Sequence, residues 1–515
     1  MCGITGFFNF NTPKPNIELV KLNDGISHRG PDDEGFFTLD YEKRKNFYLG
    51  NSSDSRLFGD YKNINEFKDQ KSIIGLGHRR FSIIDTSTRG HQPMEDSGNI
   101  IVFNGEVYNF IELKEELRAK FGYEFKTDTD TEVILKSYKA WGTKCFEKFN
   151  GFWAIAIFDS NRQELILSRD RFGQKPLYCI NNEGGFYFSS EIRPLLNHLP
   201  EIKINVSAAY NYLIHDRRDA FQPSLFHGVK DISKGTYRVV NINTGKYEDH
   251  SYWSYPKVEN LNRSIADLTE EMDYLIKKSV ELRLRCDVPF EANLSGGLDS
   301  GAIVAYASSI LKDKGQKLTT HTFDYKNNTS LSETDGAAII AKHCNTNHNV
   351  IEFDADGTWE KLNDLIFNIE EPVHSMASYV QWLGWNKIAK DGYKVILHGS
   401  ANDELMLGYS HLAQIEDIHR IRKLNFPSKM QSDSIFYYKN IGRLVKWGLK
   451  GKYWEGNFVN KDYHPNLAPF NKEFLNDNID NYNMVSKTIT NANSGDLRKL
   501  EDFKSLRIPY WNNFM

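Results

Sequence analysis

The sequence predicts two successive domains of different fold class, a mixed α and β domain followed by a parallel α/β domain. Over the first ~200 residues, short β-type runs alternate with turn signals and two helical patterns interrupt them. From about Asp267, longer helical patterns alternate with short apolar strands. The 515 residues suffice for two large domains, since a domain usually has roughly 100 to 200.

In the first domain, we expect strands and helices where apolar residues follow the matching period. The expected strands are residues 100–103, 152–158 and 164–168, and the expected helices are 110–118 and 131–141. Segment 41–71 is polar and rich in Asn and Asp, which predicts a surface insertion.

In the second domain, the expected strands are short apolar runs separated by helical patterns, which is typical of a parallel sheet. These strands are residues 288–294, 318–323, 350–353 and 395–397. Gly, Pro and Asn punctuate the boundary region 222–262. We therefore expect a first domain over 1–215, a connecting segment over 216–255 and a second domain over 256–515.

Composition excludes several classes of protein. The 64 basic and 68 acidic residues give a net charge of -4, which provides no basic field for nucleic acid. The longest uncharged apolar run, 151–158, is far shorter than the ~20 residues of a membrane span, and the start of the chain lacks a secretory pattern. Five scattered cysteines without a CxxC pair indicate a reducing, cytoplasmic location.

Cys2 is a candidate nucleophile. Removal of Met1, usual before a small residue, would leave the Cys2 thiol beside a free α-amino group. A thiol has a pKa of about 8.5 and an α-amino group about 7.7 to 8.0, so the neutral amine can accept the thiol proton near neutral pH. Taken alone, a cysteine at position 2 could also be accidental.

Four further blocks follow Cys2 in a set order. They are Arg29-Gly30-Pro31-Asp32, His78-Arg79-Arg80-Phe81-Ser82-Ile83-Ile84-Asp85, Asn104-Gly105-Glu106-Val107-Tyr108-Asn109 and Thr127-Asp128-Thr129-Asp130-Thr131-Glu132. With Cys2, they resemble the class II glutamine amidotransferase domain over residues 2–200. The resemblance implies the N-terminal nucleophile hydrolase sandwich, with αββα layers.

The resemblance also implies a glutamine site. The Asn104 side chain and the Gly105 N–H would stabilise the oxyanion formed when Cys2 attacks the carboxamide. Arg80 would bind the substrate carboxylate, with Glu106 and Asp130 near the ammonium group. The implied glutamine-binding residues are Arg80, Phe81, Ser82, Ile83, Ile84, Asn104, Gly105, Glu106 and Asp130. Taken singly, Asn-Gly could be a turn, Asp130 a helix cap and Arg80 a surface cation.

A glycine-containing turn is the first candidate binding site of the second domain. Ser295-Gly296-Gly297-Leu298-Asp299-Ser300 follows an expected strand and precedes the helical pattern 301–311, so its N–H groups can bind an anion. It lacks the Gly-Lys-Ser/Thr of a Walker A motif and is similar to the pyrophosphate loop of ATP-pyrophosphatases. After strand 395–397, Asp403 and Glu404 lie at a helix start, where they suit Mg²⁺ or complement the helix dipole.

Together, these motifs resemble the glutamine-hydrolysing asparagine synthetase family. The resemblance implies that aspartate is adenylated by ATP with release of pyrophosphate, and that ammonia freed at Cys2 displaces AMP to give asparagine. It implies Mg²⁺ on Asp299 and Asp403, and a possible homodimer. The implied ATP-binding residues are Leu294, Ser295, Gly296, Gly297, Leu298, Asp299, Ser300, Tyr325, His398 and Gly399.

Two departures from the family pattern leave the acceptor open. Ser400 stands where the family usually has a glutamate, and the chain ends at Met515, where family members continue into further helices. A missing general base would weaken the synthetase, so we expect glutaminase activity to exceed synthetase activity. The alternatives are an amidotransferase acting on another carboxylate, such as a sugar acid, or a glutaminase or sensor with a weak or silent synthetase domain.

Overall fold

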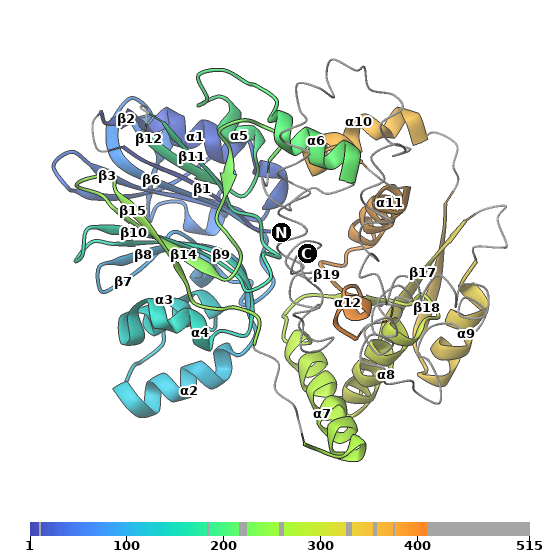
Figure 1. The fold of residues 1–515 in the computed structure, drawn as a ribbon. Coiled ribbons are helices and arrows are strands. Elements are labelled where there is room, and N and C mark those ends of the chain that lie inside the picture. The colour runs from blue at the N-terminus through green and yellow to red at the C-terminus, as the bar shows by residue number, and fades with distance from the viewer. Residues whose placement is uncertain are drawn as a thin grey trace. The chain divides into compact units, whose positions relative to one another are not determined.

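A computed structural model describes most of the chain up to Gly408 (Figure 1). Its described residues form two compact units, each treated by itself. The first unit comprises the described residues of 1–202, 228–254 and 263–398, and the second comprises those of 203–227, 255–262 and 399–408. The described ranges are 1–9, 12–182, 185–215, 224–256, 262–325, 332–353, 358–373, 376–406 and 408.

The first sheet has nine strands within the described ranges, in the order β13-β11-β12-β1-β6-β3-β4-β5, with β2 paired to β6. Central β1 pairs antiparallel with both β12 and β6, and Gly3 lies opposite Arg79. The start of β1 therefore meets the end of β6. The strands are β1 (Gly3–Phe8), β2 (Lys14–Pro15), β3 (Asp33–Asp40), β4 (Lys45–Leu49), β5 (Lys62–Asn63), β6 (Lys71–Arg80), β11 (Tyr178–Asn182), β12 (Gly185–Ser189) and β13 (Lys230–Asp231).

The second sheet is antiparallel, with the order β15-β14-β10-β9-β8-β7. Alternate residues of β8 face opposite sides: Ile100 and Val102 pack against the first sheet, while Ile101 and Phe103 pack against helices. The strands are β7 (Met94–Asp96), β8 (Asn99–Val107), β9 (Gly151–Asp159), β10 (Glu164–Arg169), β14 (Thr236–Asn241) and β15 (Tyr247–Ser251).

Helices cover the outer faces of both sheets (Figure 1). Leu19 of α1 lies against β6, and Leu113 and Val133 of α2 and α3 join the cluster under β8. The expected αββα sandwich is confirmed. Its helices are α1 (Asn16–Asp24), α2 (Phe110–Phe121), α3 (Asp130–Trp141), α4 (Cys145–Lys148) and α5 (Arg193–Leu196).

Two segments differ from their sequence-based interpretation. Segment 41–71, expected as a surface insertion, contributes β4 to the first sheet, with Leu49 and Ile64 buried. The described part of segment 216–255, expected to connect domains, supplies β13 to the first sheet and β14 and β15 to the second. Tertiary pairing overrides the polar composition of these stretches.

The third sheet is wholly parallel within the described ranges, in the order β18-β17-β16-β19. Ala292 and Leu294 share its core with Val280, Val304 and Ala337 of the helices. The expected parallel α/β architecture is confirmed. Its strands are β16 (Phe290–Asn293), β17 (Thr319–Tyr325), β18 (Asn347–Phe353) and β19 (Val395–Leu397), and its helices are α7 (Ile265–Arg283), α8 (Leu298–Lys312), α9 (Thr334–His343), α10 (Thr358–Ile369) and α11 (Met376–Lys390).

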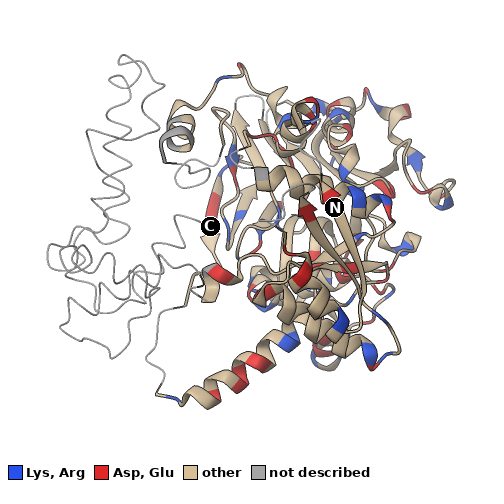
Figure 2. Cartoon of the chain, turned by 90° about the vertical axis from the view of Figure 1, so that its right-hand side faces the viewer, with Lys and Arg blue, Asp and Glu red and all other residues tan. Residues whose placement is uncertain are grey.

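The second unit has two described helices, α6 (Val206–His215) and α12 (Asn402–Met406). Over the described elements, basic and acidic residues are interspersed (Figure 2). No helix among the described residues is long and apolar enough to cross a membrane.

Candidate functional site

Strand pairing fixes Cys2 beside the residue after β6. The Phe81 N–H donates to Cys2 Sγ over 3.2 Å, and the thiol donates back to the Phe81 carbonyl over 3.5 Å. Arg29 Nε donates to the Cys2 carbonyl over 3.0 Å, and Glu191 accepts from the Arg29 guanidinium over 3.0 Å. Two of the predicted blocks therefore converge on the Cys2 backbone and thiol.

The surroundings of Cys2 require a nearby base. Burial raises the pKa of the Cys2 thiol, and the Phe81 N–H offsets this only in part. The α-amino group of Met1 is next to it, and burial lowers the pKa of this amine to about 5. With Met1 in place, this α-amino group is therefore neutral near pH 7.

A cavity opens beside the Cys2 thiol. It includes eight of the predicted catalytic or glutamine-binding residues besides Cys2, while Asn104 is not part of its lining. Gly90 and Gln92, which lie outside the predicted blocks, line it as well. The lining residues are Cys2, Arg80, Phe81, Ser82, Ile83, Ile84, Gly90, Gln92, Phe103, Gly105, Glu106, Thr129, Asp130 and Thr131.

Asn104 and Gly105 are strand residues of β8, so the turn interpretation is wrong. Asn104 is buried, and its Nδ2 has no hydrogen-bond partner among the described residues. A buried donor without a partner costs about 1 to 3 kcal/mol, which a developing oxyanion would recover. A side chain on Gly105 would lie 2.1 Å from the Phe152 carbonyl oxygen, so the strand requires glycine there.

Arg80 is a buried cation at the end of β6, so the surface interpretation is wrong. Its guanidinium donates to the carbonyls of Asp85 and Ser87, the latter over 2.7 Å. A side chain on Gly90 would lie 1.9 Å from the Arg80 guanidinium, so glycine keeps room for it. A fixed guanidinium in the cavity wall is suited to a substrate carboxylate.

Half-buried Glu106 and buried Asp130 form an acidic pair. Burial raises the pKa of Asp130 to about 7, and burial together with repulsion from Asp130 raises that of Glu106. Asp130 does not cap α3, because the Thr129 hydroxyl does so by accepting from the Glu132 N–H. Instead, the Asp130 carboxylate accepts from the Val107 N–H over 2.9 Å. A cationic substrate group would stabilise both carboxylates.

The loop after β16 has the geometry of an anion site. Gly297 caps α8, which begins at Leu298, three residues before the expected helix, and Asp299 lies in its first turn. Gly296 has φ 76°, and a side chain there would lie 2.9 Å from the Ala337 nitrogen. The hydroxyls of Ser295 and Ser300 bond each other over 3.0 Å, which closes the loop.

Several predicted ATP residues follow the carboxyl ends of neighbouring parallel strands. Leu294 follows β16, Tyr325 ends β17 and His398 follows β19. Ligands of parallel sheets bind at this edge. Gly399, Ser400 and Asp403 belong to the second unit, where Asp403 lies near the start of α12 and its carbonyl accepts from the Gly408 N–H over 2.9 Å.

Two protein families match the chain. The Glutamine amidotransferase domain family matches residues 63–253, and the Asparagine synthase family matches residues 271–503. Together they cover the second sheet, the part of the first sheet from β6 onward and the sheet that carries the anion loop, while Cys2 and strands β1 to β4 precede the first match.

Named relatives are similar over most of the chain. A putative asparagine synthetase [glutamine-hydrolyzing] 2 of Methanocaldococcus jannaschii is 33% identical over 80% of this chain and 76% of that protein. Asparagine synthetase [glutamine-hydrolyzing] 3 of Bacillus subtilis is 30% identical over 91% and 71%. A glutamine phosphoribosylpyrophosphate amidotransferase structure from B. subtilis has a TM-score of 0.38 at 14% identity, covering 68% of this chain and 81% of that one. On the two relatives, the chain belongs to the family of glutamine-hydrolysing asparagine synthetases, which are glutamine-dependent, ATP-using amide-forming ligases.

Proposed function

We propose that this chain hydrolyses glutamine at Cys2 and transfers the ammonia to aspartate activated by ATP, giving asparagine, glutamate, AMP and pyrophosphate. The main support is that one cavity is lined by residues from separate parts of the sequence, namely Cys2, Arg80, Glu106 and Asp130. We propose a first domain that extends through β15, followed by the synthetase domain. Cytoplasmic location and a homodimer stay predictions.

Glutamine hydrolysis proceeds by covalent catalysis at the thiol. With Met1 removed, the Cys2 amine takes the thiol proton, and the sulfur attacks the carboxamide carbon. The Asn104 side chain and the Gly105 N–H stabilise the oxyanion. The carbon–nitrogen bond breaks as the ammonium of Cys2 returns the proton to the leaving ammonia. Water then breaks the thioester, which releases glutamate and restores the thiol.

The buried acids make glutamine binding depend on pH. We expect the KM for glutamine to fall as the pH rises from about 6 to about 8, because only a deprotonated carboxylate pairs with the substrate ammonium. Burial raises the pKa of Asp130 to about 7, so its protonated form persists on the acid side of this range. Steady-state glutaminase kinetics across these pH values measure the effect.

Asp130→Asn removes one of these charges, and we expect it to raise the KM about 10- to 100-fold and to flatten its pH dependence. Asp69→Asn is the matched control, because Asp69 is exposed and does not line the cavity. A wild-type KM that does not change between these pH values would exclude the ammonium-binding role.

Amide formation uses the loop 294–300. The acceptor carboxylate attacks the α-phosphorus of ATP, and the bond to pyrophosphate breaks. Ammonia then attacks the acyl carbon, and the carbon–oxygen bond to AMP breaks. The start of α8 at Leu298 supports this role, because the first N–H groups of a helix favour an anion.

Mg²⁺ fits a site shared between protein and nucleotide. Within the described ranges, no group of three His, Cys, Asp or Glu residues could hold a metal by itself. Within the first unit, Mg²⁺ suits the carboxylate donor of Asp299, because this ion is commonly held by one or two carboxylates plus phosphate oxygens. When bound, it would neutralise charge on the departing pyrophosphate.

Ser400 favours a second candidate, a glutaminase whose synthetase is weak. One assay separates the two: the protein is incubated with glutamine, ATP, Mg²⁺ and aspartate, and glutamate, asparagine, AMP and pyrophosphate are quantified. Near-equal yields of glutamate, asparagine, AMP and pyrophosphate support the asparagine synthetase function. Glutamate without AMP supports the second candidate, and AMP with a sugar acid but not with aspartate assigns a different acceptor.

A further inference from the structure

We propose that Asp287 and Lys394, which flank the third sheet, are positioning residues for the glutamine pocket. The proposal rests on the proposed glutaminase function of Cys2. Both residues bind the segment 81–85, which follows β6 and supplies four residues to the cavity wall. Neither belongs to the blocks that predict the glutamine site.

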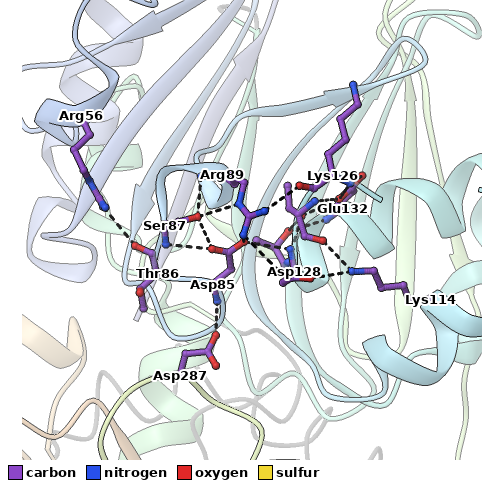
Figure 3. A network of polar contacts seen from close by, with 12 residues as sticks. Arg56, Asp85, Thr86, Ser87, Arg89, Lys114, Lys126, Asp128, Glu132 and Asp287 are labelled. Atoms are coloured by element: carbon purple, nitrogen blue, oxygen red, sulfur yellow. Dashed lines mark hydrogen bonds and ion pairs between the residues drawn. The ribbon is translucent and has the colours of Figure 1, made fainter. Parts of the chain in front are cut away.

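Asp287 holds the far end of this segment through two hydrogen bonds. Its N–H donates to the Ile83 carbonyl over 2.9 Å. Its Oδ2 accepts from the Asp85 N–H over 2.8 Å (Figure 3). The Asp85 carbonyl in turn accepts from the Arg80 guanidinium. Asp287 thus fixes the turn that orients the proposed carboxylate-binding group.

The turn at Asp85 needs such support. Asp85 has φ 48°, a left-handed conformation that is uncommon in residues other than glycine, although aspartate adopts it more readily than most. Its own carboxylate accepts from the Ser87 hydroxyl and from the Asp128 N–H (Figure 3). The Asp287 carboxylate adds the bond to the Asp85 N–H, so removing this carboxylate leaves that N–H without its acceptor.

Lys394 holds the near end of the segment. Its Nζ donates to Asp32 Oδ2 over 2.6 Å and lies 4.8 Å from the centre of the Phe81 ring. The same Asp32 oxygen accepts from the Ser82 N–H over 2.8 Å and from its hydroxyl over 2.9 Å. Burial alone would raise the pKa of Asp32, but Lys394 and Ser82 hold it below its usual value. Because Phe81 bonds the Cys2 thiol, Lys394 acts on the nucleophile through one intervening residue.

The two residues are neighbours at the amino-terminal ends of two strands of the third sheet. Asp287 precedes β16 and Lys394 directly precedes β19, and these strands pair in parallel. The Lys394 N–H also donates to the Pro289 carbonyl over 3.2 Å. The opposite ends of the same strands lead to Leu294 and His398. Strands β16 and β19 therefore connect the proposed ATP-binding residues, at their carboxyl ends, to the residues that hold the segment 81–85, at their amino ends.

The test compares truncating with conservative variants of the full chain. Asp287→Ala and Lys394→Met are expected to raise the KM for glutamine about 10- to 100-fold, since each removes hydrogen bonds to a charged group. Asp287→Asn keeps an acceptor for the Asp85 N–H, and Lys394→Arg keeps a cation for Asp32, so both should stay within about 3-fold of wild type. The double variant should fall short of the product of the single effects, because both residues hold one segment.

Lys387→Met and Asp391→Ala are the matched controls, since they break an exposed ion pair on the third-sheet side and should leave the KM unchanged. Thermal midpoints measured alongside separate positioning from unfolding. An unchanged KM in the truncating variants, or equal damage in the conservative ones, would overturn the proposal. Wild-type protein without glutaminase activity would instead overturn the proposed function itself.

Discussion

Cys2→Ala is expected to abolish glutamine hydrolysis while ammonia-dependent amide synthesis persists. The variant lacks the sulfur that forms the thioester, so we expect glutamate formation to fall by more than about 10³-fold. The anion loop 294–300 contains none of the groups around Cys2, and ammonium salts supply the nitrogen directly. The measurement is glutamate release from glutamine, with amide formation from ammonium chloride assayed in parallel.

Cys344→Ala is the matched control, because Cys344 lies at the end of α9 and should leave both activities unchanged. An uncleaved N-terminal tag tests the proposed base separately. It converts the amine to an amide that cannot accept a proton, so glutaminase activity should fall while the thiol stays in place. Residual hydrolysis near the wild-type rate in Cys2→Ala would refute the nucleophile assignment.

The second large effect is expected in the ATP site. Asp299→Ala should lower the rate of acceptor-dependent exchange of labelled pyrophosphate into ATP by about 10²-fold or more. The reason is that the metal on the triphosphate would lose a carboxylate ligand. Exchange is expected in the unmodified chain because the loop resembles an AMP-forming site and lacks the Walker lysine.

Asp335→Ala is the matched control for this variant. Asp335 occupies the first turn of the neighbouring helix α9, as Asp299 does in α8, but it does not belong to the loop 294–300. Loss of exchange in both variants would indicate a general effect of helix charge rather than a metal role. ADP and inorganic phosphate as the nucleotide products would refute the ATP-pyrophosphatase assignment.

The sequence predicts elements best where apolar residues carry a clear period. Strand 395–397 is found at the expected residues, and α3 begins one residue before its expected start. By contrast, the five residues of β15 lack the apolar alternation that marks a strand, because most of them are exposed and polar. It forms because β14 offers an edge for pairing, which no local pattern reveals.

The candidate site shows the same limit. Cys2, Arg80 and Asp130 belong to blocks that can be recognised in sequence, whereas Gly90 matters only because it leaves space for a guanidinium ten residues before it. Asp287 and Lys394 contact partners 202 and 362 residues away in the chain. Contacts at such separation are set by how the sheets pack and have no local signature.

Transfer of labelled nitrogen tests the central claim most directly. The protein is incubated with glutamine carrying ¹⁵N in its amide, aspartate, ATP and Mg²⁺, in the presence of unlabelled ammonium. The account predicts ¹⁵N-labelled asparagine, together with AMP and pyrophosphate, and loss of the label from asparagine in Cys2→Ala. Labelled glutamine hydrolysed to glutamate without any ¹⁵N in an amide product, whichever carboxylate is offered, would contradict it.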